Sequence, residues 1–146
     1  LEDHGVFTDG EVLTRASLSG IGTTSQGGAV LRASASEDSG YIAAIREPSP
    51  GNIVLRLIRF SSGSSETLND APSSLTANQA YYIRFRAEGA DLSAKFWVDG
   101  DDEPATWTVH ARDSEHESGM AGIGKLSGGY HSRWNTVVVN RGGGAA

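Results

Sequence analysis

Residues 81–99 contain two runs of alternating apolar and polar side chains, and this alternation restricts the fold more than any other feature of the chain. If Gly89-Ala90 forms the turn, Tyr82 lies opposite Trp97 and one face consists entirely of apolar or aromatic side chains. That face carries Tyr81, Ile83, Phe85, Leu92, Ala94, Phe96 and Val98, and the other carries Tyr82, Arg84, Arg86, Ser93, Lys95 and Trp97. A shift of one residue would mix the two sets. The pattern therefore predicts a hairpin of residues 81–88 and 91–99 in this register.

The same period of two recurs along the chain, and no long stretch has the helical period of 3.6. The predicted strands are residues 12–18, 29–34, 41–46, 53–60, 81–88, 91–99, 105–111, 119–125 and 133–140. Residues 66–80 are polar without a constant period, which favours a loop. Helix is expected for a turn or two only, in residues 66–80 or 113–118. The run Val137-Val138-Val139 is apolar on both faces, which is typical of a central or well-covered strand.

Nine or ten strands are too many for one open sheet that neither curls nor splits. The sequence therefore predicts an all-β fold, a two-sheet antiparallel β-sandwich. A chain of 146 residues fits one domain. We expect an N-terminal arm or cloning remnant in residues 1–9, the sandwich in residues 10–140, and a Gly-rich linker in residues 141–146.

The charge of the chain narrows the choice of partners. Twelve basic and eighteen acidic residues give a net charge of −6, and the basic residues are scattered. This composition argues against nucleic acid as a partner, because phosphate binding needs a concentrated basic face. No apolar run approaches the length of about 20 residues that a membrane-spanning helix needs, so membrane insertion is not expected. The chain has no cysteine.

Several segments resemble one known family. They are residues 81–89 (YYIRFRAEG), 92–97 (LSAKFW), 103–107 (EPATW), 119–124 (GMAGIG) and 134–139 (WNTVVV). Together they resemble the concanavalin A-like (laminin G-like) jelly-roll modules of phage tail and other virion proteins and of secreted glycan-active proteins. The resemblance covers residues 10–140 and implies a jelly-roll sandwich, a fold that hosts enzymes, lectins and inert spacers. Many relatives carry an acidic residue, sometimes near a structural calcium, where this chain has Asn135.

A catalytic role is not expected. Family members that cleave glycans need two closely spaced carboxylates, an acid and a nucleophile. The only comparable run is Asp113-Ser114-Glu115-His116-Glu117, and its polar surroundings favour a solvated loop. The chain also lacks a Gly-x-Ser-x-Gly motif and a thiol.

If the chain binds an ion, the sequence favours calcium. Asp99, Asp101 and Asp102, followed by Glu103, place four carboxylates close together, and calcium prefers such oxygen ligands. An ordinary hairpin turn around Asp99-Gly100 explains the same residues equally well.

Four aromatic residues are candidates for sugar binding, which typically combines ring stacking with polar hydrogen bonds. They are Trp97 and Tyr82 on the polar face of the hairpin, and Tyr130 and Trp134 near Gly128-Gly129. The competing interpretation is structural, with Trp97 and Tyr82 as a cross-strand pair and Trp134 as a core or rim residue.

Two functions remain open. The first, which we favour from sequence, is a non-catalytic structural or adhesion module of an extracellular or virion assembly, such as a phage tail, fibre or capsid-decorating domain. The alternative is a carbohydrate-binding module of a secreted protein. The expected partners are accordingly other subunits or surface glycans.

Overall fold

The computed structural model describes residues 9–18, 27–34, 39–49, 52–62, 64–73, 80–125 and 132–141. The strands are β1 (Gly10–Leu18), β2 (Gly27–Ala33), β3 (Ser39–Ser49), β4 (Asn52–Ser61), β5 (Ser64–Pro72), β6 (Ala80–Glu88), β7 (Asp91–Val98), β8 (Val109–Arg112), β9 (Met120–Lys125) and β10 (Ser132–Arg141). These described residues contain no helix, and consequently no helix with the length and hydropathy needed to cross a membrane. The all-β prediction is confirmed.

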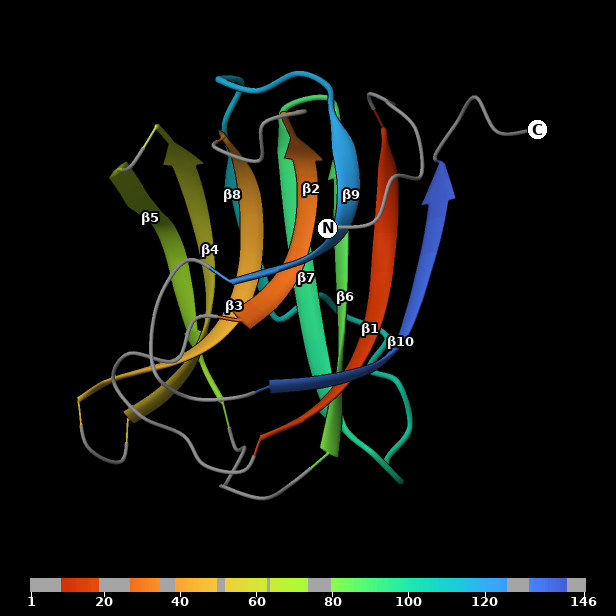
Figure 1. The fold of residues 1–146 in the computed structure, drawn as a ribbon. Helices are drawn as coiled ribbons and strands as arrows, with labels where there is room; N and C mark the ends of the chain where they lie inside the picture. The colour runs from red at the N-terminus through yellow and green to blue at the C-terminus, as the bar shows by residue number, and fades with distance from the viewer. Residues whose placement is uncertain are drawn as a thin grey trace.

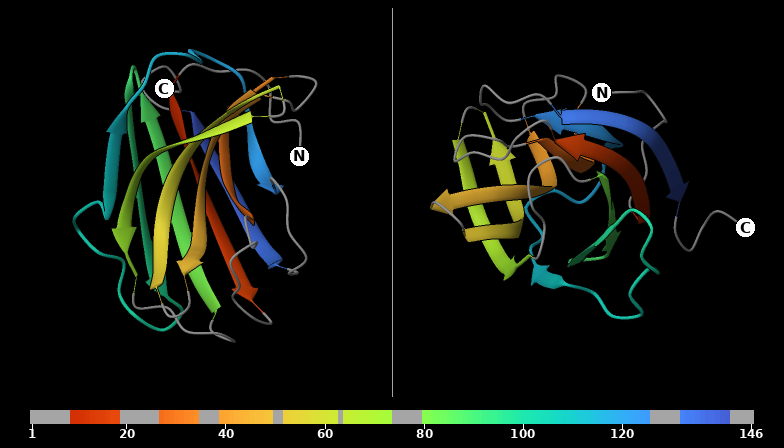
Figure 2. Two further views of the ribbon diagram at one scale, coloured as in Figure 1. Left: turned by 90° about the vertical axis from the view of Figure 1, so that its left-hand side faces the viewer. Right: turned by 90° about the horizontal axis from the view of Figure 1, so that it is seen from below.

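The strands form two antiparallel sheets that lie face to face (Figure 1). Sheet I has the order β10-β1-β6-β7-β8, and sheet II has the order β5-β4-β3-β2-β9. The view from below in Figure 2 shows both sheets curving around a common interior, which the core side chains fill. At one side the edge strands are joined directly, because the Asn69 side chain on β5 donates to the carbonyl oxygen of His110 on β8 over 2.8 Å. The predicted two-sheet sandwich is therefore confirmed.

The hairpin of β6 and β7 has the predicted register. Tyr82 pairs with Trp97 and Ile83 with Phe96, and Gly89 turns the chain with a φ of 56°, a backbone conformation that glycine adopts without steric cost. Ile83 and Phe85 are fully buried. From sheet I the core receives chiefly Val12, Tyr81, Ile83, Phe85, Leu92 and Ala94, which face Ala29, Leu31, Tyr41, Ala43, Ile45, Leu55 and Leu57 of sheet II.

One residue on the polar face of this hairpin is buried after all. Lys95 is only 8% exposed, because the loop from β7 to β8 lies against the outer face of sheet I. The Lys95 ammonium donates to the carbonyl oxygen of Pro104 over 2.7 Å and pairs with Glu103 at 2.8 Å. The loop that follows β7 decides this burial, and strand alternation does not encode it.

Three strand predictions need correction. The expected loop at residues 66–80 contains most of β5, which escaped detection because it is an edge strand with mainly exposed side chains. The expected strand at residues 105–111 is reduced to β8, Val109–Arg112. The strand that contains Val137-Val138-Val139 is β10, which lies at an edge of sheet I beside β1, so the predicted central position is wrong, while the predicted cover of its faces stays a prediction. An apolar pattern indicates whether the faces of a strand are covered, and it does not indicate how many neighbours bond to its edges.

The register makes a quantitative prediction for stability. Phe85→Ala should lower the free energy of unfolding by about 3–5 kcal/mol, because it empties a fully buried ring position. Arg86→Ala should cost less than about 1 kcal/mol, because the ion pairs of Arg86 with Glu11 and Glu88 are partly exposed to solvent. Urea unfolding of both variants measures the difference. Equal losses would contradict the register.

Candidate functional site

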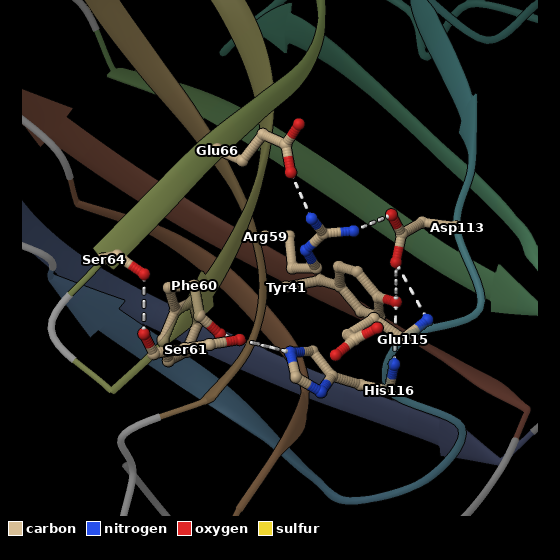
Figure 3. A network of polar contacts seen from close by, with 9 residues as sticks. All are labelled: Tyr41, Arg59, Phe60, Ser61, Ser64, Glu66, Asp113, Glu115 and His116. Carbon is tan, nitrogen blue, oxygen red and sulfur yellow. Dashed lines mark hydrogen bonds and ion pairs between the residues drawn. The ribbon is translucent and has the colours of Figure 1, made fainter.

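A cluster of polar residues lies where the chain leaves β8 of sheet I and crosses to β9 of sheet II (Figure 3). We call it the Arg59 cluster; its members are Tyr41, Arg59, Ser61, Glu66, Asp113 and His116. Tyr41 on β3 is paired with Arg59 on β4, which is in turn paired with Glu66 on β5. Strand pairing thus brings three distant sequence positions into one row, and the crossing segment supplies the other side.

Asp113 is the most heavily bonded carboxylate of the cluster. It accepts a hydrogen bond from the Tyr41 hydroxyl at 2.5 Å and another from the Glu115 amide at 3.0 Å, and it pairs with Arg59. Its side chain is 10% exposed. Burial by itself would raise the pKa of Asp113, but the donors from Tyr41, Glu115 and Arg59 outweigh burial and hold this pKa below its ordinary value of 3.8.

The direction of this shift fixes its effect on stability. A carboxyl group whose pKa is lower in the folded protein stabilises the fold above its ordinary pKa. The stabilisation is lost as the pH falls through the lowered pKa of Asp113.

Burial and the hydrogen bond to Asp113 raise the pKa of Tyr41 to about 12. The phenol therefore keeps its proton at neutral pH and donates a hydrogen bond to Asp113.

The Arg59 guanidinium joins two carboxylates that come from different parts of the fold. One nitrogen bonds to Asp113 on the crossing segment and another bonds to Glu66 on β5 (Figure 3). The Arg59 side chain is 27% exposed and that of Glu66 is 62% exposed. The cluster therefore has a buried side at Asp113 and a solvent side at Glu66, with Arg59 between them.

His116 fastens the crossing segment to sheet II. Its amide donates to the Tyr41 hydroxyl over 3.0 Å, and its ring packs edge-on against the Tyr41 ring with centroids 5.1 Å apart. Its Nε2 lies 3.2 Å from the carbonyl oxygen of Phe60 and 3.3 Å from the Ser61 hydroxyl. A carbonyl oxygen can only accept, so a hydrogen bond to Phe60 requires a proton on Nε2. The buried guanidinium of Arg32 donates to the His116 carbonyl oxygen over 3.1 Å.

The expectation that residues 113–117 form a solvated loop is wrong for Asp113. Its position inside the cluster also bears on catalysis. A general acid for glycoside cleavage needs a raised pKa, and Asp113 has a lowered one and already accepts three donors. Asp113 is therefore unsuited to act as a general acid.

The predicted aromatic candidates are only partly brought together. Tyr82 and Trp97 stack on each other on the outer face of sheet I, with ring centroids 5.2 Å apart and planes 17° from parallel. Each ring thus covers one face of the other. Trp107 lies nearby under the Arg86 guanidinium and the Lys95 ammonium, at 4.7 and 4.8 Å from its ring centroid. Cross-strand packing and cation–π contacts account for these rings without a ligand.

Trp134 and Tyr130 are the other two aromatic candidates. Trp134 lies on β10 opposite Ala16, and Tyr130 falls outside the described residues. Their role in sugar binding stays a prediction.

The predicted calcium ligands lie at the end of the β6–β7 hairpin. Asp99 accepts a hydrogen bond from Arg15 at 2.6 Å, and Asp101 closes a turn through its amide, which donates to the Val98 carbonyl oxygen over 3.0 Å. Asp101 and Asp102 are exposed. Among the described residues, no group of three or more histidines and carboxylates is arranged to hold a metal ion. The structure thus places these residues in a turn at the start of the loop from β7 to β8.

Sequence reasoning did not find Tyr41, Arg59 or Glu66 as site residues. Each occupies an unremarkable position in a separate strand, and only the register of β3, β4 and β5 aligns them. The one available signal was the run that begins at Asp113, which combines carboxylates and histidine in the stretch between two predicted strands.

At the level of sequence, no protein-family model and no curated protein matches the chain. At the level of structure, the chain is similar to carbohydrate binding module CBM66 from Bacillus subtilis, with a TM-score of 0.75 and 14% identity over 94% of this chain and 78% of that one. It is also similar to a xylan β-1,4-xylosidase from Bacillus halodurans (TM-score 0.66, 15% identity, 92% of this chain) and to a heptameric SAP-like pentraxin from Limulus polyphemus (0.59, 12%, 95%). The chain spans 28% of the xylosidase and 66% of the pentraxin. At such low identity these likenesses establish a shared jelly-roll sandwich fold.

Two buried tyrosines offer a matched test of the cluster. Tyr41→Phe should lower the free energy of unfolding by about 1.5–3 kcal/mol, because it removes a hydrogen bond to a charged acceptor. Tyr81→Phe should be neutral or stabilising, because the buried Tyr81 hydroxyl has no hydrogen-bond partner among the described residues. Urea unfolding measures both. A loss that is equal in the two variants would show that Tyr41 contributes only packing.

The melting temperature should not change when a chelator is added, since no metal site is formed by the described residues. An ion that binds only the folded state adds RT ln(1 + [L]/Kd) of stability, so its removal is visible in a thermal melt. A drop of several degrees with EDTA that is abolished in Asp101→Ala would instead establish the calcium site at Asp99, Asp101 and Asp102.

Proposed function

We propose that this domain is a non-catalytic carbohydrate-binding module whose ligand contacts the solvent side of the Arg59 cluster. The observation that carries the proposal is the Arg59 guanidinium, which two carboxylates from different elements hold in place while part of it stays exposed. A donor and an acceptor fixed side by side match the hydroxyl groups of a sugar, each of which accepts one hydrogen bond and donates another. Because the groups are already ordered, binding costs little side-chain entropy.

The outer face of sheet I is a weaker candidate for the same function. A stacking platform needs free aromatic faces. Tyr82 and Trp97 each cover one face of the other and are partly buried, and Trp107 lies against two cations. The charged groups of this face are also engaged: Glu103 pairs with Arg84 and Lys95, and Asp99 pairs with Arg15. Hydrogen bonding at the Arg59 cluster therefore explains glycan recognition better than ring stacking.

The structural neighbours support the binding hypothesis over the assembly hypothesis that the sequence favoured. One neighbour is a carbohydrate-binding module, and another is a glycan-cleaving enzyme of which this chain matches only a part. Neither is a virion protein. A structural or adhesion role, with an extracellular or virion location, stays a prediction without further support.

The proposal is tested with two arginines of the same strand. Arg59→Gln should weaken binding by a factor of roughly 10 to 100, the loss expected for hydrogen bonds to a charged group. Arg56→Gln is the control, because Arg56 pairs with Asp70 of the same neighbouring strand but lies outside the cluster. Affinity electrophoresis in gels containing xylan, arabinan, mannan or fructan detects binding, and isothermal titration quantifies it.

Trp97→Ala and Trp134→Ala complete the test of the binding surface. Binding should survive both substitutions. Saturable binding that is lost in either tryptophan variant and kept in Arg59→Gln would show that the ligand contacts the aromatic residues and not the Arg59 cluster. Absence of binding to every polysaccharide would contradict the proposed function.

A further inference from the structure

We infer that the Arg59 cluster selects neutral, hydroxyl-rich glycans and rejects polyanionic ones. This inference rests on the proposed function and adds the chemical class of the ligand. It follows from the distribution of donors, acceptors and charge among the described residues of the cluster and its surroundings.

The cations of the cluster are already neutralised. Arg59 is bonded to both Asp113 and Glu66. Arg32, the other arginine in contact with the crossing segment, has a side chain only 2% exposed, and it donates to the His116 carbonyl oxygen. A uronic acid or sulfate that bonded to Arg59 would add a third negative group beside Asp113 and Glu66, whose charges already balance that of Arg59. Repulsion between these like charges opposes the binding of an anion.

The groups that face solvent are mainly acceptors. Glu66 is 62% exposed, and Glu115 and Glu117 on the crossing segment are also exposed. Carboxylates accept hydrogen bonds from sugar hydroxyls, but they repel a second anion. The net charge of −6 acts in the same direction at long range.

Arg59 nevertheless retains donors for a neutral ligand. A guanidinium has five N–H groups, and the bonds to Asp113 and Glu66 use one N–H on each of two nitrogens. A pair of adjacent sugar hydroxyls can accept from the remaining N–H groups and donate to the Glu66 carboxylate. The site thus offers a complete set of partners to a diol and an incomplete set to an anion.

The test compares neutral and acidic polysaccharides on one set of variants. Native gels contain xylan, arabinan, mannan or fructan as neutral probes, and polygalacturonate or alginate as acidic probes. The wild-type domain should be retarded by at least one neutral polysaccharide and by neither acidic one, at low and at high salt. The double variant Glu66→Gln, Glu115→Gln should bind the neutral ligand several-fold more weakly. The charge-matched control Asp101→Asn, Asp102→Asn changes exposed residues that follow the end of β7 opposite to Ala90, the residue bonded to the Asp113 amide. It should bind the neutral ligand normally, and thermal melts confirm that all variants are folded.

Each outcome separates this inference from the proposed function. Retardation by an acidic probe alone, lost in Arg59→Gln, would overturn the selectivity for neutral glycans and leave carbohydrate binding at the cluster intact. Neutral binding that is unchanged in the Glu66→Gln, Glu115→Gln variant would overturn the role of the carboxylates. No retardation by either class would overturn both the inference and the proposed function.

Discussion

The hydrogen bond from the Tyr41 hydroxyl to Asp113 connects the two halves of the sandwich at the point where the chain passes between them. Tyr41 belongs to the core of sheet II, and Asp113 directly follows β8 of sheet I. A sandwich buries one face of each sheet, so a chain that crosses between the sheets must satisfy its polar groups at the end of an apolar core. Tyr41 meets that requirement twice, as donor to Asp113 and as acceptor for the His116 amide.

The position of Arg59 follows from the position of Asp113 at the end of the core. Asp113 would be a costly buried charge without a cation, and Arg59 supplies the cation from the strand next to Tyr41. Glu66 then holds the solvent side of the same guanidinium. The groups that we propose for glycan binding are therefore fixed by the groups that close the core, so this end of the sandwich presents an ordered polar surface.

The outer face of sheet I shows how the same residue types can serve the fold alone. Glu103 pairs with Arg84 and Lys95 there, and Trp107 packs under Arg86 and Lys95. These contacts hold the loop between β7 and β8 against the sheet. Charged and aromatic residues occur both on the outer face of sheet I and at the Arg59 cluster. The two surfaces differ in whether exposed hydrogen-bonding groups remain after the internal contacts are made.

The sequence by itself determined the fold class and the register of the β6–β7 hairpin, because strand alternation is a local signal and a one-residue shift would expose the core face. It did not determine the edge position of β10, the strand β5 or the burial of Lys95. Most side chains of β5 are exposed and therefore lack apolar alternation, and the position of β10 and the loop cover over Lys95 depend on how segments pack in three dimensions. The Arg59 cluster also belongs to the features that only the tertiary structure decided. Its residues come from β3, β4, β5 and the segment after β8, and no local pattern relates positions 41, 59, 66 and 113. Only the pairing of the strands and the crossing between the sheets bring them within hydrogen-bonding distance.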